Sequence, residues 1–298
     1  LCVTAKHCAS MTLRWIRPQS IRLFSYMMYL LSVPNFAMIL WRTTSKKLRE
    51  VKELLNFVQT EWMKLRRKKM IWFMLLAAFV MPFFACVYFN YFKTKGVDPM
   101  AFYKLAVFGY TSFIILPFVL GVFCISLMHD ENRYDMLKQL WIVPVSKMGY
   151  FLSKFIVVLL YSVIFMLVSA VVSVLFSVLP GFVAFDLQSI FFVIERCLEI
   201  AVLTAFSVLP ILAVAASQKG YIFPVCMTLL YIFLGFFITS ISMYLHPLSS
   251  VSVIISRSGN IPGLSFAQNI HVPQALFCIL IWSVLSILLA WCSLRKRK

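Results

Sequence analysis

Six runs of predominantly apolar residues constrain the fold of this chain more than any other feature of its sequence. Each run is about 20 residues long, the length at which an α-helix crosses the roughly 30 Å of hydrocarbon in a bilayer. The runs cover residues 70–92, 102–128, 155–179, 190–216, 221–245 and 273–294. Because backbone polar groups in hydrocarbon must be bonded within their own segment, each run predicts a helix. The predicted fold class is therefore all-α integral membrane, a six-transmembrane-helix bundle.

The composition agrees with a multi-pass membrane protein whose main partner is the lipid bilayer. Hydrophobic residues make up 62% of the chain and charged residues 13%, against about 25% charged in ordinary soluble domains. The net charge of +18 is compatible with nucleic-acid binding, but the basic residues lie in short loops beside the apolar runs. That placement follows the positive-inside rule, so we expect no nucleic-acid partner.

The distribution of Lys and Arg between the loops predicts the orientation of residues 51–298. Most of these cations, with Lys154 counted among them, fall in the loops of one side. The other side holds few: Lys93, Lys95 and Arg257, with Lys104 at the border. Since cations concentrate in cytosolic loops, both ends of the bundle are expected to be cytosolic.

Residues 1–50 differ from the rest of the chain. Their apolar run, Phe24 to Trp41, is short and is broken by Pro34 and Asn35. The run is a signal-like anchor or a marginal span, or the segment is upstream sequence translated from an early start. We favour the second interpretation, because residues 51–298 make a complete transmembrane domain without it. Residues 1–50 are therefore expected to be an N-terminal extension that need not be native.

Directly before the first run, residues 51–69 predict an amphipathic helix. Apolar side chains such as Leu54, Val58 and Leu65 recur at helical spacing with polar side chains between them. Such a helix lies in the plane of the membrane interface with its cations toward the lipid headgroups. The residues expected to anchor it there are Glu61, Trp62, Lys64, Arg66 and Arg67.

The longest charged segment of the hydrophobic part of the chain runs from His129 to Lys154. Within it, Leu137, Leu140 and Trp141 fall on one face of a short helix that would end before Pro144. A solvated connector would need only charge and length. The apolar face therefore favours a cytosolic coupling helix that docks into a groove of a partner protein.

No motif in the sequence indicates catalysis, a metal or a cofactor. The chain has no G-x-x-x-x-G-K-[ST] and no G-x-G-x-x-G, so nothing is predicted to bind nucleotide phosphates. The adjacent residues His129, Asp130 and Glu131 cannot easily converge on one ion. The eight Cys lack metal-site or disulfide spacing. We expect no catalytic residue, no metal and no cofactor bound by this chain.

Two features are predicted for the outer side. Glu195, Arg196 and Glu199 lie near the outer third of the fourth run, where ionisable residues tend to face water or the bundle interior. They are either a polar lining of a translocation path or gate for a cationic substrate, or Glu195 and Arg196 end an interfacial helix over about residues 188–196. In the second case the span starts near Leu198 and contains Glu199, the better candidate for burial. The loop from His246 to Val272 is long but only mildly polar, which predicts short helices or re-entrant turns packed on the bundle.

Two motifs resemble those of ABC-2 type permeases. The segment Glu131…Asp135-Met136-Leu137-Lys138…Pro144-Val145-Ser146-Lys147…Lys154 is similar to the family's E-x-x-x-G-T-L-K…P-V-S-R…K after the second span. The segment Glu61-Trp62-Met63-Lys64-Leu65-Arg66-Arg67 resembles its E-x-x-K-x-(K/R) motif before the first span. The resemblance covers about Val51–Lys298 and is closest to permeases of bacitracin-resistance and lantibiotic-immunity exporters. One departure is Asp135-Met136, where the family usually has Gly-Thr.

The resemblance implies the membrane-spanning permease subunit of an ATP-driven exporter in a bacterial plasma membrane. Two permease chains, identical or related, would assemble with two ABC ATP-binding subunits, which bind the ATP and magnesium. The peptide substrate would be an antimicrobial peptide such as bacitracin or a lantibiotic. The residues expected to contact the ATPase are Glu131, Leu137, Lys138, Leu140, Trp141, Pro144 and Lys147.

Two other functions use the same sequence features. A non-transport membrane scaffold or sensor would dock a cytosolic partner through the same loop. An intramembrane enzyme would be active as a purified chain without ATP. A neighbouring ATP-binding subunit distinguishes the exporter from both.

Overall fold

The computed structural model describes residues 52, 54–92, 98–133, 147–183, 185–218, 220–257 and 270–296. Contacts between Cα atoms divide the chain into Leu1–Leu55 and Asn56–Lys298, and the fold described below is that of the second unit. Its described residues form helices and no strands, and six helices are long and apolar enough to cross a membrane. The predicted six-helix bundle is thus confirmed.

The first two spans are built from several short helical pieces. The first joins α4 (Lys69–Leu76), the 3₁₀ turn η2 (Ala77–Phe79) and α5 (Val80–Tyr91). The second joins α6 (Pro99–Tyr103), two π-helical segments, η3 (Lys104–Phe108) and η4 (Thr111–Ile115), and α7 (Leu116–Arg133). Before the first span, residues 54–66 form the predicted amphipathic helix, which ends at a non-helical turn over residues 67–68.

The remaining four spans are α9 (Lys147–Val178), α10 (Leu187–Ser207) continued by α11 (Leu209–Ser217), α12 (Ile222–Ile241) and α14 (Val272–Lys296). The third span departs most from the prediction, because α9 begins at Lys147 and not near residue 155. The charge of Lys154 suggested a loop. The helix continues through this residue because its ammonium group is paired inside the protein, as described below.

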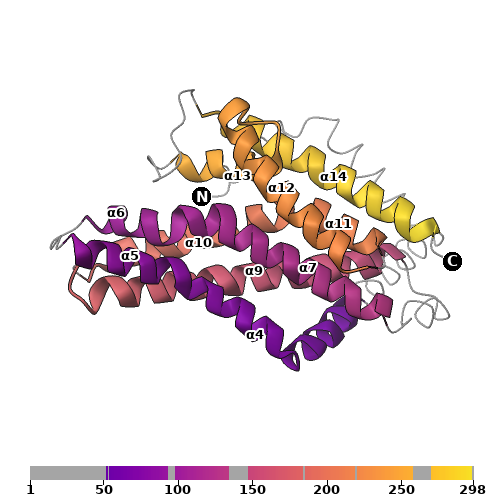
Figure 1. The fold of residues 1–298 in the computed structure, drawn as a ribbon, viewed down its shortest axis with the longest axis horizontal. Helices are drawn as coiled ribbons and strands as arrows, with labels where there is room; N and C mark the ends of the chain where they lie inside the picture. Colours follow the sequence, from indigo (N-terminus) through magenta and orange to yellow (C-terminus); the bar gives the residue numbers. More distant parts are fainter. Residues whose placement is uncertain are drawn as a thin grey trace, which may run out of the picture. The chain divides into compact units, whose positions relative to one another are not determined.

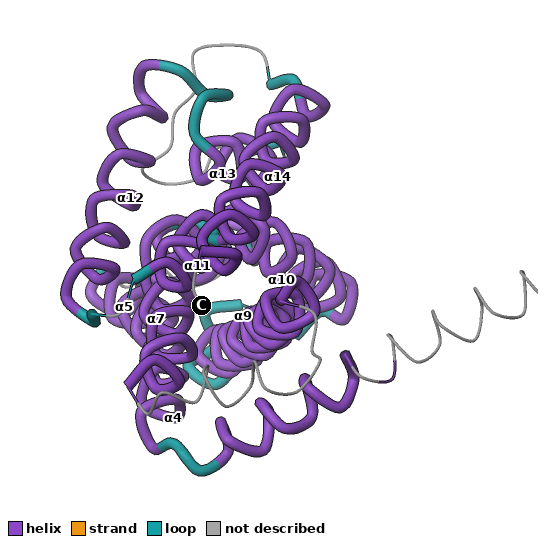
Figure 2. Tube along the Cα trace, turned by 90° about the vertical axis from the view of Figure 1, so that its right-hand side faces the viewer, coloured by secondary structure: helices purple, strands orange, loops and turns teal. Residues whose placement is uncertain are grey.

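The second, third and fourth spans form the centre of the bundle. In the most apolar 18-residue stretch of these three spans, the buried share is 72%, 56% and 61%. The corresponding share is 17% in the first span and 28% in the fifth. Hydroxyl groups of α9 satisfy buried carbonyls on its neighbours: Ser162 Oγ donates to Ala201 O of α10 at 2.8 Å. Figures 1 and 2 show α12, α13 and α14 gathered on one side of this centre.

A short helix, α13 (Pro247–Ser256), follows the fifth span and agrees with the first of the two predicted alternatives, short helices or re-entrant turns, for the described part of this loop. His246 caps it, because its Nδ1 accepts a hydrogen bond from Leu248 N at 3.3 Å. The imidazole is 5% exposed and lies 4.4 Å from the ring of Tyr231. It fits there because Gly235 of α12 has no side chain: a Cβ at this position would lie 3.1 Å from His246 Nδ1. Desolvation lowers the pKa of His246 to about 4.

Gly121 of α7 packs so closely on α12 that only a hydrogen fits. A Cβ at this position would overlap Thr228 Cγ2 and approach its Oγ1 to 3.4 Å. We expect Gly121→Ala to lower the free energy of unfolding by about 1–3 kcal/mol, since overpacking displaces a tightly packed neighbour. Thermal unfolding of the purified chain in detergent measures this.

The matched rescue for that variant is Thr228→Ser. Serine removes Cγ2 but keeps the hydroxyl that donates to Pro224 O at 2.8 Å. The double variant should regain most of the lost stability. If Gly121→Ala alone unfolds like the wild type, the two helices are not in close contact.

Burial of His246 predicts a pH dependence of stability. Its pKa is lower in the folded chain, about 4, than its ordinary value of 6.5, so the unfolded state binds more protons between these values. This stabilisation is complete above pH 6.5 and is lost as the pH falls toward 4, by at most about 3 kcal/mol. His246→Asn keeps a capping oxygen but does not titrate, so its unfolding temperature should fall less between these pH values. His271→Asn, at an exposed histidine, is the control and should follow the wild type.

Candidate functional site

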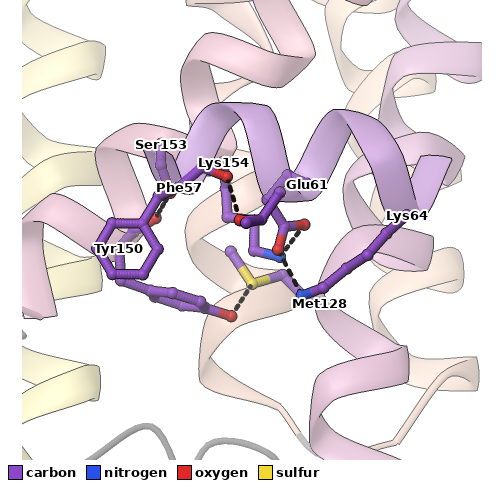
Figure 3. A network of polar contacts seen from close by, with 8 residues as sticks. Phe57, Glu61, Lys64, Met128, Tyr150, Ser153 and Lys154 are labelled. Carbon is purple, nitrogen blue, oxygen red and sulfur yellow. Dashed lines mark hydrogen bonds and ion pairs between the residues drawn. The ribbon is translucent and has the colours of Figure 1, made fainter. Parts of the chain in front are cut away.

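A buried ion pair joins the amphipathic helix to the third span. Lys154 Nζ of α9 lies 2.5 Å from Glu61 Oε2, and the two side chains are 1% and 8% exposed. The second carboxylate oxygen, Glu61 Oε1, accepts a hydrogen bond from Lys64 Nζ at 2.7 Å, one helical turn further along. Figure 3 shows both ammonium groups directed at the Glu61 carboxylate.

Two further side chains surround this pair. The ring of Tyr150, one turn before Lys154 on α9, has its centroid 5.3 Å from Lys154 Nζ, a distance at which the π-face attracts a cation. The Tyr150 hydroxyl contacts Met128 Sδ near the end of α7 at 3.6 Å. We refer to Glu61, Lys64, Met128, Tyr150 and Lys154 as the Glu61 cluster. It connects the amphipathic helix, α7 and α9 in one place.

Burial makes this pair sensitive to change. Removing two charges from water is unfavourable, and only their close approach and further hydrogen bonds offset that penalty. If either partner is removed, the other remains as an uncompensated buried charge. Separation of Glu61 from Lys154 is therefore unfavourable, and the ion pair holds the amphipathic helix against the start of α9.

The sequence predicts the two members of this pair separately and does not predict their pairing. The charge of Lys154 predicts a loop residue, but Lys154 lies inside α9 and is buried. Glu61 was expected at the membrane interface, but its carboxylate is directed into the protein. A signal was present: Glu61 lies four residues before Leu65 and three after Val58, on the apolar face of its helix. The other expected anchors, Trp62, Lys64, Arg66 and Arg67, are exposed.

The predicted ATPase-contacting segment lies mostly outside the described residues. Leu137, Lys138, Leu140, Trp141 and Pro144 fall in the interval 134–146, and of Glu131 only the backbone, within α7, is described. The contact with an ATPase stays a prediction.

Lys147 is described and begins α9. Its Nζ donates a hydrogen bond to Leu294 O near the end of α14, at 2.8 Å. The two helices that bracket the 134–146 interval, α7 and α9, both contribute to the Glu61 cluster through Met128, Tyr150 and Lys154. The helices that flank this interval thus contact the amphipathic helix, through Lys154, and the last span, through Lys147.

The predicted outer residues form a second charged cluster. Glu199 Oε2 lies 2.6 Å from Arg196 Nη1, and Glu199 Oε1 lies 2.8 Å from Arg257 Nη2, just after α13. Glu195 is exposed. Two guanidinium groups already neutralise Glu199, which favours a tie between α10 and α13 over a carboxylate free to bind a cationic substrate. The role of these residues in translocation stays a prediction.

The alternative interpretation of this region was a separate interfacial helix before the span. Residues 187–207 form one continuous helix, and with α11 the fourth span contains 31 residues. At 1.5 Å per residue this is about 46 Å, longer than the hydrocarbon core, so part of it extends into the interface. The helix is therefore long enough to be both interfacial and spanning.

Comparison with known proteins gives one family. A family model described as ABC-2 family transporter protein matches residues 57–235, more than half of the chain. The match starts in the amphipathic helix and includes Glu61, Lys154 and Glu199. No curated protein matches the chain.

The burial of the Glu61–Lys154 pair predicts a large effect for Lys154→Met. This variant leaves the Glu61 carboxylate buried with only Lys64 beside it, and should lower the free energy of unfolding by about 3–5 kcal/mol. The double variant Glu61→Met/Lys154→Met should recover most of the loss, because an apolar pair of similar volume leaves no unpaired charge. Denaturant unfolding of the purified chain measures both.

Lys64→Met is the matched control for that experiment. The Lys64 side chain is 47% exposed, so water screens its bond to Glu61 and the expected loss is about 0–1 kcal/mol. Equal losses for Lys64→Met and Lys154→Met would contradict the buried pair.

Proposed function

Since the chain belongs to the ABC-2 family of transporter proteins, we propose that it exports an antimicrobial peptide such as bacitracin or a lantibiotic. As a member of this family it is a multi-pass membrane permease and not itself the ATPase. The peptide substrate is supported by the likeness of its Glu61–Arg67 and Glu131–Lys154 motifs to those of bacitracin-resistance and lantibiotic-immunity permeases.

The proposed assembly contains two permease chains, identical or related, and two ABC ATP-binding subunits that bind ATP and magnesium. Residues 51–298 form its transmembrane domain, and residues 1–50 are an extension to it. The family resemblance supports a bacterial plasma-membrane location, and the excess of Lys and Arg on one side supports an orientation with both ends of residues 51–298 in the cytosol.

The Glu61 cluster carries the proposed coupling mechanism. The ATPase docks on residues 131–147, at the start of α9. Lys154 lies two helical turns after Lys147, so a displacement of this end of α9 moves both residues together. Lys154 carries the movement to the amphipathic helix through Glu61, at 2.5 Å, and Lys147 carries it to the last span through Leu294 O, at 2.8 Å.

This mechanism requires the amphipathic helix and α9 to move as one body. Burial of the ion pair supplies that property, because separating the charges in a low-dielectric site is unfavourable. ATP-driven closure of the ATPases would then move the third span together with the amphipathic helix and the cytosolic end of the last span. The outer region around α13 would respond as the extracellular gate.

Purification of the tagged chain from its native membranes tests the assembly. We expect a stoichiometric ATP-binding subunit to co-purify, with vanadate-sensitive ATP hydrolysis. Leu140→Asp/Trp141→Asp should remove that subunit without unfolding the bundle, because charge abolishes the apolar docking face. Leu140→Met/Trp141→Phe keeps the face apolar and is the matched control.

Two outcomes would contradict the proposal. If the Asp variant retains its ATPase at wild-type yield, residues 134–146 are not the docking segment. If the chain purifies alone under mild detergent, a scaffold or sensor function is favoured over the exporter. The substrate is tested separately: expression of the intact assembly should raise the inhibitory concentration of bacitracin or a lantibiotic, and unchanged susceptibility would exclude these peptides.

A further inference from the structure

A cavity of about 350 Å³ lies where the amphipathic helix, α4 and α9 meet. Trp62 and Arg66 line it from the amphipathic helix, Trp72 and Leu75 from α4, and Tyr161 and Ile164 from α9. This volume falls within the range of small-molecule sites, roughly 300–1,000 Å³. The lining is apolar apart from the Arg66 side chain and the polar ends of the aromatic residues.

The cavity exists because the chain turns sharply before the first span. The non-helical residues 67–68 separate the amphipathic helix from α4, and the two helices diverge from that turn (Figure 1). α9 holds both: Lys154 is paired with Glu61, and the Tyr161 hydroxyl donates to Ile71 O of α4 at 3.2 Å. The space between the diverging helices is therefore fixed at both sides.

The charged residue in the lining of the cavity is a cation, Arg66. Arg66 lines it, and Arg67, Lys68 and Lys69 follow directly in the sequence. Glu61, the acid of the same helix, is bound to Lys64 and Lys154. Within the part of the chain that the structure describes, no ion pair involves the side chains of Arg66 or Arg67. An apolar cavity with an uncompensated guanidinium fits a ligand with an anionic head and an apolar tail.

The aromatic residues place this cavity at the edge of the hydrocarbon. Trp62 and Trp72 are both partly exposed, at 41% and 62%. Tryptophan concentrates at the membrane–water interface, and the cations beside it lie at the start of the first span. The surrounding anionic amphiphile at this depth is a phospholipid.

We infer that this cavity binds one anionic phospholipid per chain, with its phosphate on the Arg66 guanidinium and an acyl chain against Leu75 and Ile164. This is a defined site that bridges three helices, which differs from the general attraction of surface cations to headgroups. The inference requires only that the chain lie in a membrane. It does not depend on the identity of the transported substrate.

Lipid retention by the purified full chain tests this site. Detergent-purified protein is incubated with phosphatidylglycerol or phosphatidylcholine, and bound lipid is counted by native mass spectrometry. We expect about one tightly retained phosphatidylglycerol and at least tenfold weaker retention of phosphatidylcholine. Arg66→Gln should weaken phosphatidylglycerol retention about tenfold or more, since it removes a charge-assisted contact to phosphate.

Arg67→Gln is the matched control, because this neighbouring cation does not line the cavity. It should change retention by no more than a few fold. Leu75→Trp, which fills the cavity, should reduce retention while leaving Arg66 in place, and thermal unfolding without added lipid identifies any variant that fails to fold.

Three results would overturn the inference. Equal losses for Arg66→Gln and Arg67→Gln would indicate diffuse attraction at the surface. Competition by glycerophosphoglycerol, which has the headgroup without acyl chains, would indicate a phosphate site and not a lipid site. Unchanged retention in Leu75→Trp would place the lipid elsewhere.

Discussion

The buried ion pair between Glu61 and Lys154 is the interaction on which the rest of this structure depends. Its members are 93 residues apart in the sequence, and neither charge is stable alone in apolar surroundings. Their union fixes the amphipathic helix against α9. Because that helix is held at one side and α4 at the other, the sharp turn at residues 67–68 leaves a cavity and exposes a row of cations at its edge. The proposed coupling mechanism and the proposed lipid site both depend on this single constraint.

Much of the fold follows from the sequence because a bilayer allows few solutions. Backbone groups in hydrocarbon require helices, so apolar length alone predicts six spans and most of their limits. The third span shows where this reasoning fails. Hydropathy excludes a charged residue such as Lys154 from a span, whereas the structure neutralises that charge with a partner supplied by a distant helix. Close contacts such as that of Gly235 with His246 cannot be predicted from the local sequence pattern either, because they depend on which helices become neighbours.

The candidate site was predictable in its parts and not in its assembly. The motif residues Glu61, Lys64 and Lys147 were identified from sequence, but Glu61 was expected at the membrane interface although its spacing from Val58 and Leu65 places it on the apolar face of its helix. Periodicity gives the face of a residue but not its partner, so the pairing with Lys154 required the three-dimensional arrangement. The positive-inside rule adds a specific error here, because it counts every cation near a span as a loop charge. It cannot distinguish the buried Lys154 from the exposed Arg66 and Arg67.

The polar contacts of α9 with its neighbours are distributed unevenly along its length. With 32 residues it is about 48 Å long, which exceeds the roughly 30 Å thickness of the hydrocarbon core. Its strongest polar contact, to Glu61, lies near its start. Further along, hydroxyl contacts link it to its neighbours: Ser162 to Ala201 O, and Ser177 to the Tyr103 hydroxyl at 3.2 Å. Interhelical hydrogen bonds of this kind contribute only about 0.6 kcal/mol each in a membrane protein. Polar contact along α9 is thus concentrated at the end nearest Lys147, where the Glu61 cluster joins it to the amphipathic helix, and is weaker toward its other end.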